Sequence, residues 1–278
     1  MAKRIWLGIA ALVAAGIVWG AITMFGWMID ETHFDRPSAD FDRLTTQMEE
    51  LPGVSVTDMG RWVEAPAFWT PTSHIGLTVD EARLPELLDA ACSTGYAEPV
   101  SWSLAVEREG GTTVSVHGDP TTGCLDVGFD VVGFVGAARS SVPGLDLQPA
   151  IWGDDQFAVV ALEEHSESIT TLLPLVVHAD ELRDAAGLNS TRSVEINAST
   201  LILVVEPGES DRYAELLSGL VDEHGVTSYW ADGGGTPTDG VTKVQVVAPD
   251  REHSAIEEAI RSSGLHIADF PVRFISQR

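Results

Sequence analysis

The sequence predicts an α+β protein: an N-terminal transmembrane helix followed by tandem ferredoxin-like αββαββ sandwiches, whose antiparallel sheets carry helices on one face. Two observations predict this fold class. Residues 5–29 form a long uncharged apolar run, and the rest of the chain repeats the order helix, strand, strand about six times. Helix starts recur roughly every 40–46 residues. The repeat is therefore recognised from the order of elements more than from residue identity.

The apolar run predicts a membrane span. Residues 5–29 contain no Asp, Glu, Lys or Arg, and about 20 such residues suffice to cross a bilayer as a helix. Lys3 and Arg4 precede the run, and Asp30 follows it. Because positive charge stays on the cytoplasmic side, residues 1–4 form a cytoplasmic stub and the remainder is extracytoplasmic.

Two features of this run have alternative interpretations. A cleavable signal peptide would have an apolar core of ~7–15 residues followed by small residues. The small residues 14–16 lie in the middle of the run, which favours an uncleaved anchor. Gly16 and Gly20 form a G-x-x-x-G pattern that allows weak helix self-association, although glycines are also common in membrane helices.

Helix-period spacing of apolar residues defines the helices. Leu84, Leu87, Leu88 and Ala91 give the clearest example, and Gly95 ends that helix. Comparable patterns are found near 41–51, 172–187, 213–221 and 256–263, and a weaker one, interrupted by two glycines, near 130–140.

Strand-like runs lie in pairs between these helices. Alternating or continuous apolar residues predict strands, and Gly110-Gly111 predicts a hairpin. The runs are 75–79, 102–106, 114–116, 157–162, 201–205, 244–248 and 270–274.

Two helix–strand–strand units complete one ferredoxin-like sandwich. This predicts three domains, at 38–124, 125–207 and 208–278, with one strand too few in the third. The alternatives are two domains or one continuous sheet.

The two cysteines, Cys92 and Cys124, both follow the membrane segment. An even number of cysteines in an oxidising compartment predicts a disulfide. In the predicted topology, the helix ending near Cys92 and the hairpin preceding Cys124 meet at one edge of a sheet. Two unpaired buried cysteines are the alternative.

Composition excludes several classes of function. The chain has 42 Asp and Glu against 16 Lys and Arg, a net charge of −26. This charge argues against nucleic-acid binding and against the binding of anionic lipid by a cluster of basic residues. Its only lysines are Lys3 and Lys243, and arginine-rich usage is typical of GC-rich bacterial genomes. The sequence has no Walker, G-x-S-x-G or H-E-x-x-H motif, and its histidines are scattered. It therefore predicts no cofactor, no metal site and no enzyme.

Three polar segments have weak functional interpretations. Glu163-Glu164-His165 follows a strand and could supply acid–base groups, but such a run is typical of a solvated turn. Asp154-Asp155 could bind Ca²⁺ weakly or form a hairpin turn. Residues 233–240 are glycine-rich and suit either a binding loop or a flexible connection.

Large aromatic residues gather around Pro66. Trp62, Phe68 and Trp69 lie close together in the sequence between two strands. Buried aromatic anchors dominate many interfaces, so this segment is a candidate partner-binding loop. The alternative is a plug between two domains.

Together these features predict a single-pass, membrane-anchored extracytoplasmic protein of the bacterial envelope. Its expected role is non-enzymatic, as a protein-interaction or scaffold module that binds another envelope protein. The alternative is a sensor or binder of a small ligand or cation between domains, and an enzyme ranks third.

Overall fold

The computed structural model describes residues 33–64, 69–108, 112–118, 120, 123–152, 156–162, 168–231 and 241–275. The predicted membrane segment 5–29, with Gly16 and Gly20, lies outside them, so its membrane insertion stays a prediction. Within the described ranges, no helix has both the length and the apolar character needed to cross a membrane.

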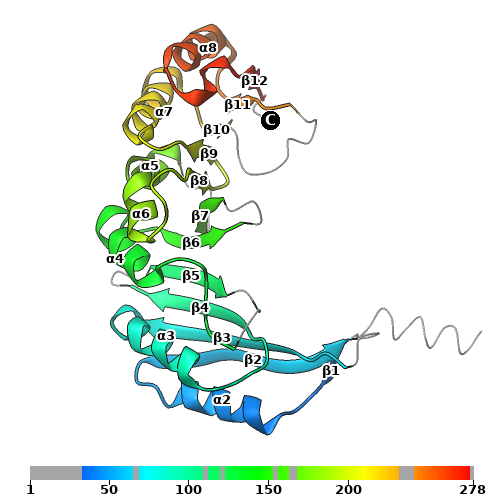
Figure 1. Cartoon of the computed structure of the whole chain (residues 1–278). Coiled ribbons are helices and arrows are strands. Elements are labelled where there is room, and N and C mark those ends of the chain that lie inside the picture. Colours follow the sequence, from blue (N-terminus) through cyan, green and yellow to red (C-terminus); the bar gives the residue numbers. More distant parts are fainter. Residues whose placement is uncertain are drawn as a thin grey trace, which may run out of the picture.

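The described strands form one twelve-stranded mixed sheet in which spatial order equals chain order (Figure 1). The prediction of tandem ferredoxin-like sandwiches is therefore wrong, and the alternative of one continuous sheet is confirmed. The strands are β1 (His33–Asp35), β2 (Val54–Glu64), β3 (Thr72–Asp80), β4 (Ser101–Glu107), β5 (Thr113–Gly118), β6 (Asp146–Ile151), β7 (Phe157–Leu162), β8 (Val194–Asn197), β9 (Leu201–Val205), β10 (Ser228–Ala231), β11 (Val244–Val247) and β12 (Val272–Phe274).

Helices connect the parallel pairs of this sheet. From β3 onward, antiparallel hairpins alternate with parallel crossovers, and each crossover carries helix. The predicted order of helix, strand, strand is confirmed. The helices are α2 (Ala39–Glu49), α3 (Leu84–Ser93), α4 (Val131–Ser141), α5 (Ile169–Val177), α6 (Ala179–Ala185), α7 (Ser210–His224) and α8 (His253–Ser262), with short 3₁₀ turns η1 (Glu81–Arg83), η2 (Asp250–Glu252) and η3 (His266–Asp269).

The predicted and observed folds differ in where they place the two strands that a helix connects. A ferredoxin-like sandwich places another strand between the two strands that a helix connects. Here they are direct neighbours, as in the parallel pairing of Leu77 with Leu104. The chain therefore advances steadily across the sheet, and β5–β6 and β9–β10 pairings cross the predicted domain boundaries.

One face of the sheet carries the core. Alternate residues such as Val79, Val106, Val114 and Leu147 are buried and lie in register across neighbouring strands. The helices pack on this face in a continuous arc (Figure 1), with contacts between α4 and α6 and between α5 and α7. No described helix covers the opposite face, which we call the helix-free face.

Two of the predicted helices, α4 and α5, contain residues that are unfavourable inside a helix. Gly133 weakens the prediction of α4, yet a Cβ there would clash with the carbonyl oxygen of Ala185. Glycine is therefore needed for the close approach of α6. The single helix predicted near 172–187 is two helices, α5 and α6, and α5 starts earlier, at Ile169, so that Pro174 lies inside it.

Candidate functional site

The helix-free face is polar from β3 to β6. Residues that alternate with the core in β3 to β6 point to this face, because side chains change sides at each position of a strand. Hydroxyl, imidazole and amide groups predominate among them: His74, Thr78, Ser101, Ser103, Thr113, Ser115, His117 and Gln148.

A hollow of about 440 Å³ lies on this face. Its floor is made of small residues, including Gly76 and Ala105 on neighbouring strands. A bulge in β2 between Val56 and Asp58 borders it, and a Cβ on Gly76 would lie 2.9 Å from Thr57 Oγ1. Glycine thus lets the bulged strand approach, and the bulge turns Asp58 towards the hollow.

Two polar pairs line the hollow. Asp58 Oδ2 lies 3.5 Å from His74 Nε2. Ser103 Oγ and His117 Nδ1 are hydrogen-bonded at 3.0 Å. Asp58, Gly76, Ser103 and His117 form one row across four strands.

A second hollow, of about 670 Å³, shares His117 and Gln148 with the first. Its walls combine apolar Phe129 and Ile151 with polar groups that include Arg192. The two hollows form one trough that runs across the strands from β2 to the connection before β8. We call it the polar trough.

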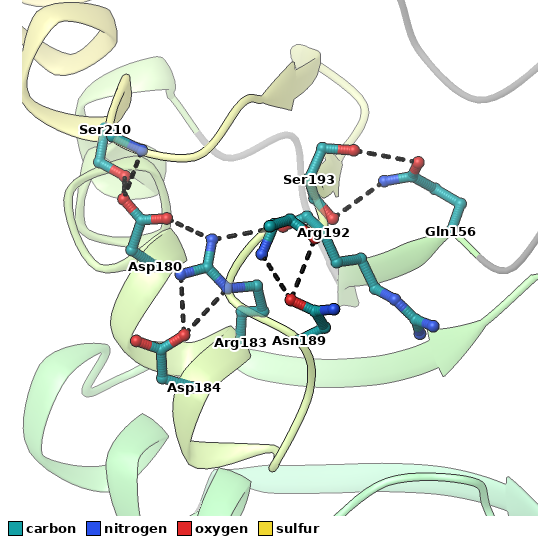
Figure 2. A network of polar contacts seen from close by, with 10 residues as sticks. Gln156, Asp180, Arg183, Asp184, Asn189, Arg192, Ser193 and Ser210 are labelled. Carbon is teal, nitrogen blue, oxygen red and sulfur yellow. Dashed lines mark hydrogen bonds and ion pairs between the residues drawn. The ribbon is translucent and has the colours of Figure 1, made fainter.

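A polar network around the buried Arg183 fixes the connection that carries Arg192 (Figure 2). Arg183, buried in α6, donates to Asp180, to Asp184 and to the backbone oxygen of Arg192. The second oxygen of Asp180 accepts from the Ser210 hydroxyl and the Gly208 amide. This network joins α6 to the start of α7 and to the wall of the trough.

The chemistry of the trough suits recognition. Ser103 and His117 resemble the nucleophile and base of a hydrolase. Within the described residues, however, no carboxylate forms a hydrogen bond or ion pair with His117 as a third member. The same described ranges hold no group of three or more His, Cys, Asp or Glu side chains arranged for a metal ion. Neutral hydroxyl, imidazole and amide groups both donate and accept hydrogen bonds.

Cys92 and Cys124 lie at bonding distance, with Cα atoms 4.2 Å apart. Their predicted proximity is confirmed, and the distance allows a disulfide between them. It joins the end of α3 to the connection after β5. The cysteine pair thus links the helix layer to the connection that follows β5.

The predicted aromatic loop is described in part. Trp62 lies in β2, opposite Thr72, and donates from Nε1 to Glu64. Trp69 is 79% exposed, so it does not plug a gap within the described structure. Phe68 lies outside the described residues, as do Glu163-Glu164-His165, Asp154-Asp155 and 233–240.

Comparison with protein-family models, with curated proteins and with solved structures finds no match. The site therefore has to be interpreted from its own geometry. Sequence reasoning missed the trough, although polar residues at alternate positions of 101–105 and 113–117 mark it.

Proposed function

We propose that this protein is a membrane-anchored, extracytoplasmic and non-enzymatic binding protein of the bacterial envelope, and that its helix-free face binds another protein. The polar trough is the observation that supports this most directly. It is broad, open and lined by groups that form hydrogen bonds without a catalytic constellation. Solenoid-like repeats commonly use such an extended face for partners.

The membrane anchor is the part of this proposal that comes from sequence. The uncharged run 5–29 and the flanking Lys3, Arg4 and Asp30 support an N-terminus in the cytoplasm. The described chain then lies outside, where a disulfide between Cys92 and Cys124 is stable.

Chemical crosslinking in native membranes tests the protein partner. The full chain is crosslinked, purified in detergent and analysed by mass spectrometry. We expect one specific protein to be crosslinked to the unaltered chain but not to a His117→Ala, Gln148→Ala variant. The reason is that both side chains line both hollows. A His178→Ala, Gln47→Ala variant, altered in the helix layer, is the matched control and should retain it.

Equal capture by both variants would show that the trough is not the contact surface. Absence of any specific crosslinked protein would contradict the proposed partner.

A small ligand or cation is the second candidate. The hollow near Phe129, Ile151 and Arg192 favours it, because small-molecule sites combine apolar walls with a few polar groups. Thermal-shift screening tests it: a ligand at 100 times its Kd should add ~2.7 kcal/mol to the free energy of unfolding. A hit abolished by Phe129→Ala and unaffected by His178→Ala would assign the ligand to this hollow.

A further inference from the structure

The sheet ends at β12 with half of a hairpin (Figure 1). Every earlier strand that follows a helical crossover pairs antiparallel with the next strand: β4 with β5, β6 with β7, β8 with β9 and β10 with β11. β12 also follows a crossover, because it is parallel to β11, but no described strand pairs with its other edge. The repeat therefore stops before its last hairpin is complete.

The open edge of β12 presents main-chain hydrogen-bonding groups. The carbonyl of Pro271 and the amide of Ile275 both bond to β11. Since successive residues of a strand point these groups to opposite edges, the amides and carbonyls of Val272 and Phe274 point away from β11. Pro271 takes no donor from the open edge, because its own position faces β11. An antiparallel strand could therefore pair there.

The helix layer stops at the same place. α5 contacts α7 and α7 contacts α8, but no helix of the described ranges follows α8. A hollow of about 380 Å³ lies beside it, lined by Ile260 of α8 and by Phe270 and Val272. Ile275, directly after β12, is 41% exposed. One more strand and one more helix would cover these apolar groups.

The side chains of β12 restrict which strand can pair with it. Phe274 stacks on His253 of α8, with ring centroids 3.6 Å apart, so it lies on the helix-covered face and needs an apolar neighbour. Arg273 is exposed on the helix-free face, where a second arginine opposite it would be unfavourable. β12 of another copy meets both needs if the two Phe274 residues lie opposite each other, because Arg273 then lies opposite Ile275.

A second copy would also supply the missing helix at a suitable distance. α8 connects β11 to β12, so a twofold axis beside β12 places the two α8 helices two strand spacings apart. Strands are ~4.8 Å apart, which gives ~9.6 Å, and packed helices lie about 8–10 Å apart. The hollow beside α8 carries charges of both signs, Arg261 with Glu257 and Asp269, so two copies need not meet as like charges.

We propose that this chain forms a twofold-symmetric dimer in which β12 pairs antiparallel with β12 of a second copy, with Phe274 at the axis. One contact completes the last hairpin of both chains, as is typical of an isologous interface. The sheet continues from one chain into the other, with both helix layers on the same face. The dimer leaves the polar trough open, since the trough lies between β2 and β8, and it does not depend on the function proposed above.

Disulfide trapping tests the pairing. Positions 273 and 275 of the two chains would form a non-hydrogen-bonded pair with Cα atoms about 4.5 Å apart, which a disulfide can bridge. Full-length Arg273→Cys and Ile275→Cys variants with different tags are coexpressed and oxidised in native membranes with copper phenanthroline. We expect a link between the two tags about fivefold or more above that of either variant alone, in which the new thiols are too far apart. The unaltered chain gives the background.

A proline substitution separates this contact from any other self-association. Val272→Pro removes an amide of the open edge without removing a bond to β11, so the dimer Kd should rise about tenfold or more. Asp35→Pro is the matched control, because it removes an outward amide at the other edge of the sheet, in β1, and should leave the dimer unchanged. Sedimentation of the full chain in detergent measures the Kd, and thermal unfolding verifies that both variants fold.

Three results would overturn the proposal. The first is a link between the two tags at background level. The second is a monomer at all concentrations, or a dimer that Val272→Pro weakens no more than Asp35→Pro does. The third is a link from positions 273 and 275 to a different protein in place of the second copy, which would assign the open edge to that protein.

Discussion

The two faces of the sheet use the same strands for opposite purposes. On the helix-covered face, Leu77, Leu104 and Val116 are buried under helices. Ser103 and Ser115 each precede one of these buried residues in the sequence, and they lie on the helix-free face, where they line the polar trough. Because side chains alternate between faces, a single strand can supply packing energy on one side and recognition groups on the other.

The faces also differ in charge. Carboxylates lie on the exposed surfaces of helices, as with Asp222 and Glu223 of α7 and Glu258 of α8. The centre of the trough has neutral hydroxyl and imidazole groups, with Asp58 at its border. These exposed carboxylates therefore lie on the helix layer and not in the centre of the trough.

The largest expected effect comes from truncation on the helix-covered face. Leu104→Ala should lower the free energy of unfolding by about 2–5 kcal/mol, because it opens a cavity in the core. Ser103→Ala, on the same strand but the other face, should change it by less than about 1 kcal/mol. Guanidinium unfolding of the full chain in detergent measures the free energy of unfolding of both variants. A similar decrease for Leu104→Ala and Ser103→Ala would contradict the distinction between the two faces.

The cysteine pair should have the next largest effect. It closes a loop across a sequence separation of 32 residues. The double variant Cys92→Ser, Cys124→Ser should therefore lower the free energy of unfolding by about 3 kcal/mol. Thiol alkylation of the unfolded, unreduced protein should find no free thiol. Two alkylated cysteines would contradict the bond, and an unchanged denaturation midpoint would contradict its stabilising role.

Loss of a carboxylate that pairs with the buried Arg183 should have a moderate effect. Asp180→Ala leaves Arg183 with fewer hydrogen-bond partners and removes the hydrogen bond to Ser210. We therefore expect the free energy of unfolding to fall by about 1–3 kcal/mol. Asp222→Ala, on the surface of α7, is the control and should be nearly neutral. If both variants melt alike, the network does not hold the helix layer together.

The smallest effect is expected at acid pH near the last helix. The hydrogen bond from His224, with a further one from Arg251, lowers the pKa of Glu252 below its ordinary 4.5. Since the folded pKa is the lower one, this contribution is present above pH 4.5 and is lost as the pH falls through the lowered value.

Melting temperatures measured between pH 7 and pH 3 test this. Glu252→Gln should melt below the unaltered chain at pH 7, and the two curves should converge in acid. Glu257→Gln, on α8 and outside the His224–Glu252 hydrogen bond, is the control and should melt like the unaltered chain at pH 7. A difference that persists at pH 3 would assign the effect to packing and not to charge.

Much of the local structure is predictable from the sequence because it depends on neighbouring residues. The pattern of Leu84, Leu87 and Ala91 defines α3, and the nearby cysteine pair follows from the order of elements. The trough is not predictable in this way. Asp58, His74, Ser103 and His117 come from four strands, and their meeting depends on register and on the bulge in β2.

The sequence by itself determined the uncharged segment 5–29, the acidity, the cysteine pair and the repeated order of helix and strands. These features depend on composition and on local periodicity. Only the tertiary structure decided that each crossover joins adjacent strands, as Leu77 and Leu104 show, and hence that one sheet replaces several sandwiches. The apolar periodicity is the same in either arrangement, because a strand buries alternate residues whichever neighbour it pairs with. The choice therefore rests on long-range strand pairing, which the local pattern does not encode.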